Sequence, residues 1–239
     1  MTFRWDWLPK LAEGLLLTME ITALCVAIGI VLGTLLAAGR VYGRRWLRLL
    51  CGAYIEFFRG TPLLVQVFIV YFGLPSVGVT LSAFTSAALA LGLNTAAYQA
   101  EYLRGALQAV GSGQLQAARS IGMPLRQAVW SVVFPQAFRI VLPAWSNELI
   151  QMLKYSSIVF TITLYDLMGM GKKLAAKHFT YLEVFLVVAL FYLAVVLILT
   201  QLLNLLERRT RLPGLGSDIE ARVKHRSSTP LRRPGGRGR

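Results

Sequence analysis

The chain contains two long apolar stretches, one from Gly14 to Ala38 and one over about residues 182–206. A helix that crosses the hydrocarbon core of a bilayer, about 30 Å thick, needs roughly 20 consecutive apolar residues, and both stretches are long enough. The first also exceeds the apolar core of a cleaved signal peptide, which has about 7–15 residues. Hydrophobic residues make up 56% of the chain, above the roughly 45–50% of soluble domains. The sequence therefore predicts a membrane protein with several spans and a retained first span.

Three further spans are expected, over about residues 61–74, over about residues 79–100 and from near Val132 onward. Residues 47–60 are expected to form a helix at the cytoplasmic interface, which Pro62 ends because proline disrupts a helix interior. The predicted fold class is all-α, a polytopic membrane protein with five transmembrane helices. Its expected parts are an external N-terminal segment over 1–13, a membrane domain over 14–207 and a basic, disordered cytoplasmic tail over 208–239.

Basic residues indicate the orientation of the chain. Four arginines follow the first span, and more Lys and Arg follow the last. Because Lys and Arg are enriched on the cytoplasmic side of a membrane, we expect the N-terminus outside and the C-terminus in the cytoplasm. The segment from Leu164 to Tyr181 has the composition of an external loop, although its lysines run against this rule. The arginines are Arg40, Arg44, Arg45 and Arg48, and the lysines are Lys172, Lys173 and Lys177.

The net charge of +14 is not taken as a sign of nucleic-acid binding, because the basic residues lie at span ends and in the tail. Cys25 and Cys51 have no metal-ligand spacing. His178 and His225 each stand alone in the sequence. No metal site and no catalytic residue is therefore expected.

Small and charged residues predict how the helices pack. Gly29 and Gly33 form a GxxxG pair, which lets another backbone approach closely, and ordinary helix packing is favoured over a dimer seam. Residues three apart on a helix are neighbours. Two ion pairs are therefore expected, Glu56 with Arg59 and Glu101 with Arg104.

Polar residues inside the expected spans are candidates for a substrate path. Asn94, Thr95 and Tyr98 lie in the third span, where polar groups face a partner helix or a cavity; hydrogen bonding between helices is favoured. Pro135 and Pro143 are expected to bend the fourth span, and broken helices occur where they are buried in protein or line a water-filled cavity. The stretch from Pro143 onward is therefore the first candidate for the path, with Asn147, Glu148, Gln151, Lys154, Ser156 and Ser157.

The stretch from Gly113 to Pro135 predicts a two-helix loop between the third and fourth spans. Ala, Gln and Arg favour a helix over residues 116–121, and Gly122 suits a left-handed cap at its end. Pro124 suits the first turn of a second helix. Such a loop, on the cytoplasmic side, forms a compact knob for a partner protein.

This loop resembles the EAA loop of bacterial ABC importer permeases, whose pattern is Glu-Ala-Ala, three residues, Gly, nine residues and Ile-x-Leu-Pro. Gln116-Ala117-Ala118, Gly122 and Val132–Pro135 stand at that spacing. Gln116 departs from the usual Glu, which weakens any charge-assisted contact there. The segments FFRGTPLLVQVFIVYF, AAYQAEYLRGALQAVGSGQ and PQAFRIVLPAWSNELIQMLKYSSI are similar to the polar amino acid uptake branch of that family, and the resemblance covers roughly residues 11–207.

The resemblance implies the type I ABC importer permease fold in a bacterial inner membrane, with a polar amino acid as cargo. The implied partners are two ABC ATPase subunits, a second permease copy or a sister permease, an external solute-binding protein and the lipid bilayer. The ATPase subunits would use ATP and Mg²⁺. This chain would bind no cofactor itself, since it has no GxxxxGK[ST] phosphate loop. The implied ATPase-coupling residues are Gln114, Gln116, Ala117, Ala118, Arg119, Gly122, Met123 and Arg126.

Other functions remain open from the sequence alone. An ion-coupled secondary carrier commonly has two internal repeats, and none is found here. A membrane scaffold would use the knob only as an interaction site. The same ABC machinery could also carry a compatible solute such as ectoine. The sequence does not specify the cargo, nor whether the permease is a homodimer or a heterodimer.

Overall fold

A computed structural model describes residues 5–210 of the chain, which fold into helices joined by short connections. This part of the chain contains no β-strand, so the predicted all-α class is confirmed. The α-helices are α1 (Trp7–Tyr42), α2 (Arg45–Gly60), α3 (Leu63–Phe68), α4 (Ala83–Ala109), α5 (Ser112–Ser120), α6 (Leu125–Ala128), α7 (Phe134–Tyr155), α8 (Leu167–His178) and α9 (Tyr181–Thr210). Between them lie the π-helices η1 (Ile69–Gly73) and η3 (Val129–Val133) and the 3₁₀-helices η2 (Leu74–Val77) and η4 (Ser156–Ile162).

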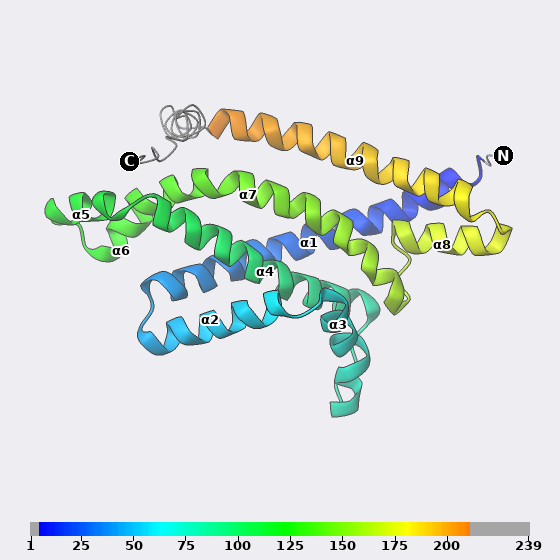
Figure 1. The fold of residues 1–239 in the computed structure, drawn as a ribbon, viewed down its shortest axis with the longest axis horizontal. Helices are drawn as coiled ribbons and strands as arrows, with labels where there is room; N and C mark the ends of the chain where they lie inside the picture. The colour runs from blue at the N-terminus through cyan, green and yellow to red at the C-terminus, as the bar shows by residue number, and fades with distance from the viewer. Residues whose placement is uncertain (1–4, 211–239) are drawn as a thin grey trace, which may run out of the picture.

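The four longest helices, α1, α4, α7 and α9, run roughly along the long axis of the molecule (Figure 1). The short helices α5 and α6 lie at one end of this bundle, and α8 lies at the other end with the N-terminus. The segment that begins with α3 projects away from the bundle. The two ends of the molecule therefore carry different structures.

Three stretches within the described residues are long and apolar enough to cross a membrane: α1, residues 125–162 and residues 181–209. A fourth span results if α2 and residues 63–77 count together, and these two parts are bent by 104°. The break expected at Pro62 is therefore confirmed. The remaining expected span corresponds to α4, which is 27 residues long and packs against α1 and α7. It is not among the stretches long and apolar enough to cross a membrane, so the described residues give up to four such spans rather than the five expected. Its alanines and polar side chains suit contact with neighbouring helices better than contact with lipid.

Glycine allows α1 and α4 to pack closely. A Cβ atom added to Gly33 would lie 3.0 Å from the carbonyl oxygen of Ala96 and 3.1 Å from the amide nitrogen of Ala100. A Cβ atom added to Gly29 would lie 2.6 Å from Cγ2 of Thr95. The GxxxG pair thus serves helix packing within the chain, as the sequence predicted.

Gly33→Ala is expected to lower the free energy of unfolding by about 1–3 kcal/mol, because the added methyl group meets backbone atoms that cannot rotate away. Thermal unfolding in detergent measures this. Gly105→Ala on α4 is the matched control, since nothing lies within 4 Å of its added Cβ. That change should raise stability by roughly 0.5–1 kcal/mol, because alanine is the better helix former. If Gly33→Ala and Gly105→Ala changed the free energy of unfolding in the same direction and by the same amount, the close approach of α1 and α4 would be contradicted.

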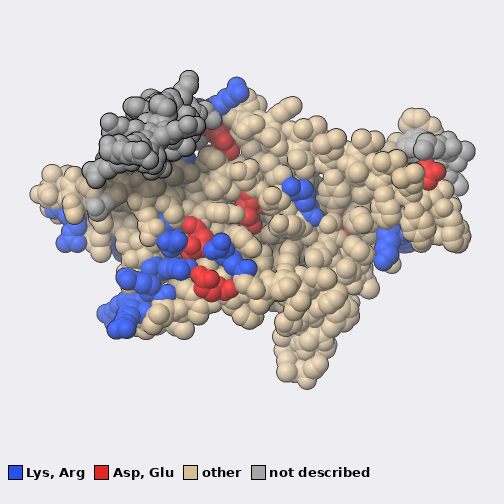
Figure 2. Space-filling model, in the orientation of Figure 1, with Lys and Arg blue, Asp and Glu red and all other residues tan. Residues whose placement is uncertain are grey.

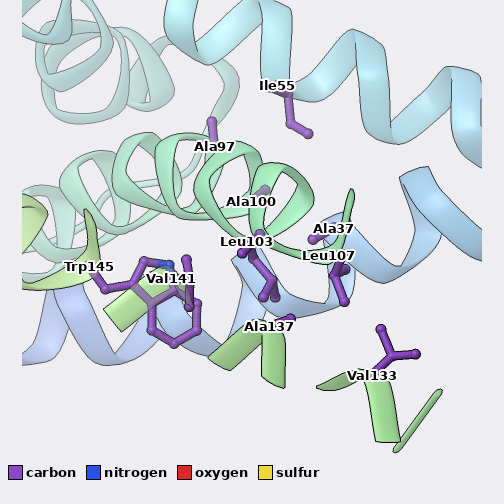
Figure 3. Close-up of a cluster of buried hydrophobic side chains, with 11 residues drawn as sticks. Ala37, Ile55, Ala97, Ala100, Leu103, Leu107, Val133, Ala137, Val141 and Trp145 are labelled. Carbon is purple, nitrogen blue, oxygen red and sulfur yellow. The ribbon is translucent and has the colours of Figure 1, made fainter. Parts of the chain in front are cut away.

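A buried apolar cluster ties α1, α2, α4 and α7 together near the α5 end of the bundle. Its members on α4 are small or of medium size, so the backbones of the neighbouring helices lie close to that helix. Figure 3 shows Ala97, Ala100, Leu103 and Leu107 of α4 with Ala37 of α1, Ile55 of α2, and Val133, Ala137, Val141 and Trp145 of η3 and α7. This cluster fixes the base from which α5 and α6 extend.

The N-terminal segment expected over residues 1–13 is helical from Trp7 onward and continuous with α1. Trp7 is fully buried and packs in one cluster with Leu11 of the same helix and with residues of α8 and α9. A tryptophan just before a span is typical of the membrane interface, but here the ring of Trp7 is part of the core. The tail expected over 208–239 lies outside the described residues from residue 211 onward.

The loop expected from Leu164 to Tyr181 is wrong in its local structure, because it contains α8. The carboxylate of Asp166 caps this helix by accepting a hydrogen bond from the Gly169 amide, at 2.9 Å. The glycines that suggested turns serve packing instead: a Cβ atom on Gly171 would lie 2.5 Å from Cγ2 of Val188 on α9. Glycine in this segment therefore marks close helix contact rather than an irregular chain.

Candidate functional site

The two-helix loop between α4 and α7 has the conformation that the sequence predicted. Helix α5 ends at Ser120, and Gly122 follows with φ +89°, in the left-handed region. The amide of Gly122 donates to the carbonyl of Arg119 at 3.0 Å, and the amide of Met123 donates to Ala118 at 3.2 Å. These bonds satisfy carbonyls at the helix end, as a glycine cap does.

The second helix of the loop starts one residue later than expected. Pro124 is the residue before α6, with an extended ψ of 150°, rather than a member of its first turn. Proline still suits this place, because it lacks an N–H group and the first turn of a helix leaves such groups unpaired. The angle between the two helices is thus set by Gly122 and Pro124 together.

Most of the loop's surface is open to a partner. Of the eight predicted coupling residues, Ala118 is buried and Met123 is half-buried, and these two anchor the loop. Exposed are Gln114, Gln116, Ala117, Arg119, Gly122 and Arg126. Figure 2 shows basic side chains gathered at this end of the molecule, over α2 and near α5.

The loop is joined to α7 without a flexible linker. Helix α6 passes directly into η3 and then into α7, and residues 125–162 together form one stretch of membrane-spanning length. Leu115 of α5 also packs against the buried cluster that contains Val133 and Ala137. A displacement of α5 and α6 would therefore be passed to α7 as a rigid element.

A buried carboxylate lies between α4 and α7. Oε1 of Glu148 accepts a hydrogen bond from Thr95 at 3.0 Å, and Oε2 accepts one from Tyr102 at 3.4 Å. Thr95 in turn accepts a bond from the amide of Gln99 at 3.3 Å. Glu148 is only 6% exposed, and no cationic side chain of the described residues pairs with it. This chain of polar groups fixes the register of α7 against α4.

The spacing of Asn147, Glu148, Gln151 and Lys154 predicts one polar face on α7, but in the structure these residues point in two directions. Glu148 points toward α4, whereas Asn147, Gln151 and Lys154 are exposed on another side of α7. At 100° per residue, these three lie within about 60° of one another and Glu148 lies outside that sector. The hydroxyls of Ser156 and Ser157 donate to the backbone carbonyls of Leu153 and Lys154.

Asn94 takes part in hydrogen bonding between helices, the interpretation that the sequence favoured. Its amide donates to the carbonyl of Phe58 at 3.1 Å and to Oε1 of Gln66 at 3.0 Å. Gln66 donates to Phe58 and Thr61 in turn, at 2.9 and 3.1 Å. These bonds hold the 104° break between α2 and α3 against α4. Tyr98, on the same helix, lies under the guanidinium of Arg59, 5.3 Å from the ring centroid.

Asn94→Leu is expected to destabilise the fold by about 1–3 kcal/mol, because the carbonyl of Phe58 and the side chain of Gln66 each lose a buried partner. Asn147→Leu on the exposed side of α7 is the control, with an expected change within about 0.5 kcal/mol. Thermal unfolding in detergent compares the two. Equal losses would contradict the bridging role of Asn94.

An ion cluster joins three helices at the α5 end of the bundle. Glu101 of α4 contacts Arg40 of α1 and Arg104 of α4, each at 2.7 Å, and Arg59 of α2 at 3.9 Å. The pair expected between Glu101 and Arg104 is confirmed. The pair expected between Glu56 and Arg59 is wrong, because Glu56 lies 3.7 Å from Arg40 instead. Figure 2 shows acidic side chains among basic ones on this part of the surface.

Sequence reasoning missed Arg40, Gln66 and Gln99 as members of these polar groups. Arg40 was counted only as a marker of orientation, and its acidic partner lies 61 positions away. Gln66 was treated as part of an apolar segment. Gln99 carried a usable signal, because it lies four residues after Thr95 and so on the same face of one helix.

A bundle of membrane-length helices, with a glycine-capped loop exposed at one end and polar groups buried between spans, is the architecture of a multi-span membrane transport subunit. The chain belongs to the family of inner membrane components of binding-protein-dependent transport systems, whose model matches residues 29–212. The predicted family resemblance is thereby confirmed, and the chain is a multi-pass membrane permease.

Individual relatives are similar in sequence to this chain over most of their length. The probable amino-acid ABC transporter permease PatM of Vibrio harveyi is 40% identical, over 82% of this chain and 89% of its own. The octopine transport system permease OccM of Rhizobium meliloti is 39% identical, over 88% and 93%. The arginine transport system permease ArtQ of Bacillus subtilis is 38% identical, over 85% and 94%.

Solved structures share the fold. A crystal structure of an amino acid ABC transporter with histidines has a chain 38% identical, with a TM-score of 0.81 over 87% of this chain and all of that one. An inward-facing methionine ABC transporter, MetNI, is 20% identical with a TM-score of 0.74, which shows likeness of fold. The type I importer permease fold expected from the sequence is confirmed.

Proposed function

We propose that this chain is the permease subunit of an ATP-driven importer that moves a polar amino acid delivered by an external solute-binding protein. The observation that carries the proposal is the exposed loop around Gly122, which continues through α6 and η3 into α7. A capped, rigid and exposed element is suited to receive force from another protein. Relatives named for octopine, arginine and glutamine transport support an amino acid cargo.

The motor of such an importer is a separate pair of ATPase subunits, which bind ATP and Mg²⁺. The permease is paired with a second copy or a sister permease, so that two loops meet two ATPases. The N-terminus lies outside and the loop lies in the cytoplasm, since the arginines after α1 favour that side. Closure of the ATPases would move the loop and α7 as one body, a rigid-body switch between inward-facing and outward-facing states.

The exposed polar side of α7 is our candidate for the substrate path. A polar face on a membrane helix is costly unless it is paired or hydrated, so Asn147, Gln151 and Lys154 are best placed beside water or a second permease. The ammonium of Lys154 suits the carboxylate of an amino acid. Thr95 and Glu148, by contrast, hold α7 on α4. A zwitterionic compatible solute such as ectoine would meet the same groups and is the alternative cargo.

Cross-linking tests the docking of the loop on an ATPase. Gln116→Cys is labelled with a photoreactive maleimide in the assembled complex, and the native cysteines Cys25 and Cys51 are buried and so little labelled. We expect a cross-link to the ATPase subunit. Gln201→Cys, exposed on α9, is the control and should give none. A transport-active complex that never cross-links from residue 116 would contradict the proposal.

A further inference from the structure

An apolar groove of about 280 Å³ opens beside the loop, between α1, α4 and the start of α7. Its walls are hydrophobic side chains, among them Leu35 and Ala38 of α1, Leu107 of α4 and Trp130 of η3. Arg126 is its only charged lining residue. An apolar groove of this kind, within a membrane protein, suits a hydrocarbon chain.

A second hollow of about 440 Å³ adjoins the groove and has a different character. It is open and is lined by Pro124, Arg126, Gln127 and Trp130. The two cavities share Arg126 and Trp130. The groove is apolar, and the open hollow beside it adds the guanidinium of Arg126 and the amide of Gln127. Together they match a molecule with a hydrocarbon tail and an anionic head.

The guanidinium at the junction is available for such a head. Arg126 is exposed and forms no hydrogen bond or ion pair with any other residue that the structure describes. Trp130 is 55% exposed, and its ring lies against that of Phe134, tilted by 44° with centroids 4.8 Å apart. Tryptophan at the level of lipid headgroups is typical of membrane interfaces, and guanidinium groups bind phosphate bidentately.

The groove also continues onto an exposed apolar surface of α1. Leu35 lines it, and Leu35 and Val31 of α1 are 64% and 65% exposed. These apolar side chains have no protein cover in the described chain. A tail entering the groove can therefore pass along α1 into the bilayer core.

We propose that the groove and the hollow together bind one anionic phospholipid of the leaflet on the loop side, with an acyl chain in the groove and the phosphate on Arg126. The site includes Val129 and Trp130 of the π-helix η3, and such π-helical segments often occur at functional sites. A lipid there would stiffen the connection between α6 and α7. This last consequence rests on the import function proposed above, whereas lipid binding itself does not.

Native mass spectrometry of the purified chain tests the site with two lipids that have the same acyl chains, phosphatidylglycerol and phosphatidylcholine. Both lipids carry a phosphate, but the choline ammonium of phosphatidylcholine offsets its charge, whereas phosphatidylglycerol keeps a net negative charge beside Arg126. Wild type is therefore expected to bind phosphatidylglycerol about tenfold more tightly. Arg126→Gln should reduce this preference to near unity. Arg208→Gln, on the last turn of α9, should leave it unchanged.

The apolar half of the site has its own variant. Ala38→Phe fills the groove and should weaken binding of both lipids, whereas Ala194→Phe on the exposed side of α9 should not. Equal affinities of wild type for the two lipids, or an unchanged preference in Arg126→Gln, would overturn the proposal. So would a structure of the assembled transporter with a protein segment in the groove. Because these measurements need no ATPase, failure of uptake with lipid binding intact would count only against the import function.

Discussion

Gly122→Val is expected to abolish most of the substrate-stimulated ATPase activity of the assembled importer while leaving the membrane bundle folded. The residue has φ +89°, and a β-branched side chain in that region is a true outlier that costs about 1–3 kcal/mol. A strain of about 2 kcal/mol, the middle of that range, shifts an equilibrium between loop conformations by more than roughly tenfold. The loop would then present its two helices at a wrong angle to the ATPase, and stimulated activity should fall by at least about that factor.

Two matched variants separate backbone conformation from mere side-chain bulk. Nothing lies within 4 Å of a Cβ atom at Gly122 or at Gly113, so neither change causes a clash within the described chain. Gly113 lies inside α5 and has no positive φ, so Gly113→Val should retain most of the stimulation. Gly122→Asn should also retain much of it, because Asn visits the left-handed region. Equal losses in all three variants would show that the cap conformation is not what matters.

Glu101→Gln is expected to lower the free energy of unfolding by about 1–3 kcal/mol, between the values for exposed and for buried ion pairs, because the cluster is only partly buried. The side chain of Glu101 is 14% exposed and faces three arginines from α1, α2 and α4. Removing its charge leaves those arginines to repel one another at the base of the loop. Thermal unfolding of the purified chain in detergent measures the loss.

The control for this prediction lies in the same cluster. The side chain of Glu56 is 72% exposed and lies 3.7 Å from Arg40, and exposed ion pairs contribute about 0–1 kcal/mol. Glu56→Gln should therefore cost less than about 1 kcal/mol. A comparable cost for Glu56 and Glu101 would mean that the cluster is a solvated surface patch rather than a joint between helices.

Features that depend on neighbours along the chain were predictable. Gly122 has its left-handed conformation because the alanine-rich helix before it needs a cap, and Pro62 breaks the chain because it cannot continue a helix. The GxxxG pair on α1 and the pair of Glu101 with Arg104 depend on spacings of three or four residues. These features depend on residues only a few positions apart, so the sequence alone predicts them.

Features that depend on distant partners were not predictable. Arg40 pairs with Glu101 because α1 packs on α4, and spacing on α2 alone suggested a pair between Glu56 and Arg59. The spacing of the polar residues of α7 predicted one polar face. Glu148 instead points toward Thr95 of α4, because of the way these two helices pack. Helix α8 was missed because Gly169 and Gly171 resemble turn residues unless their packing partners are known.

Uptake of radiolabelled amino acids into proteoliposomes tests the central claim most directly. The vesicles hold this permease, its ATPase subunits and, where required, the sister permease, and the solute-binding protein is added outside. We predict uptake that requires both ATP inside the vesicles and the binding protein, and that is lost in Gly122→Val. Uptake driven by a proton or sodium gradient without ATP would contradict the proposed ATP-driven import. The chain would then be an ion-coupled carrier, and no ATPase would act on its exposed loop.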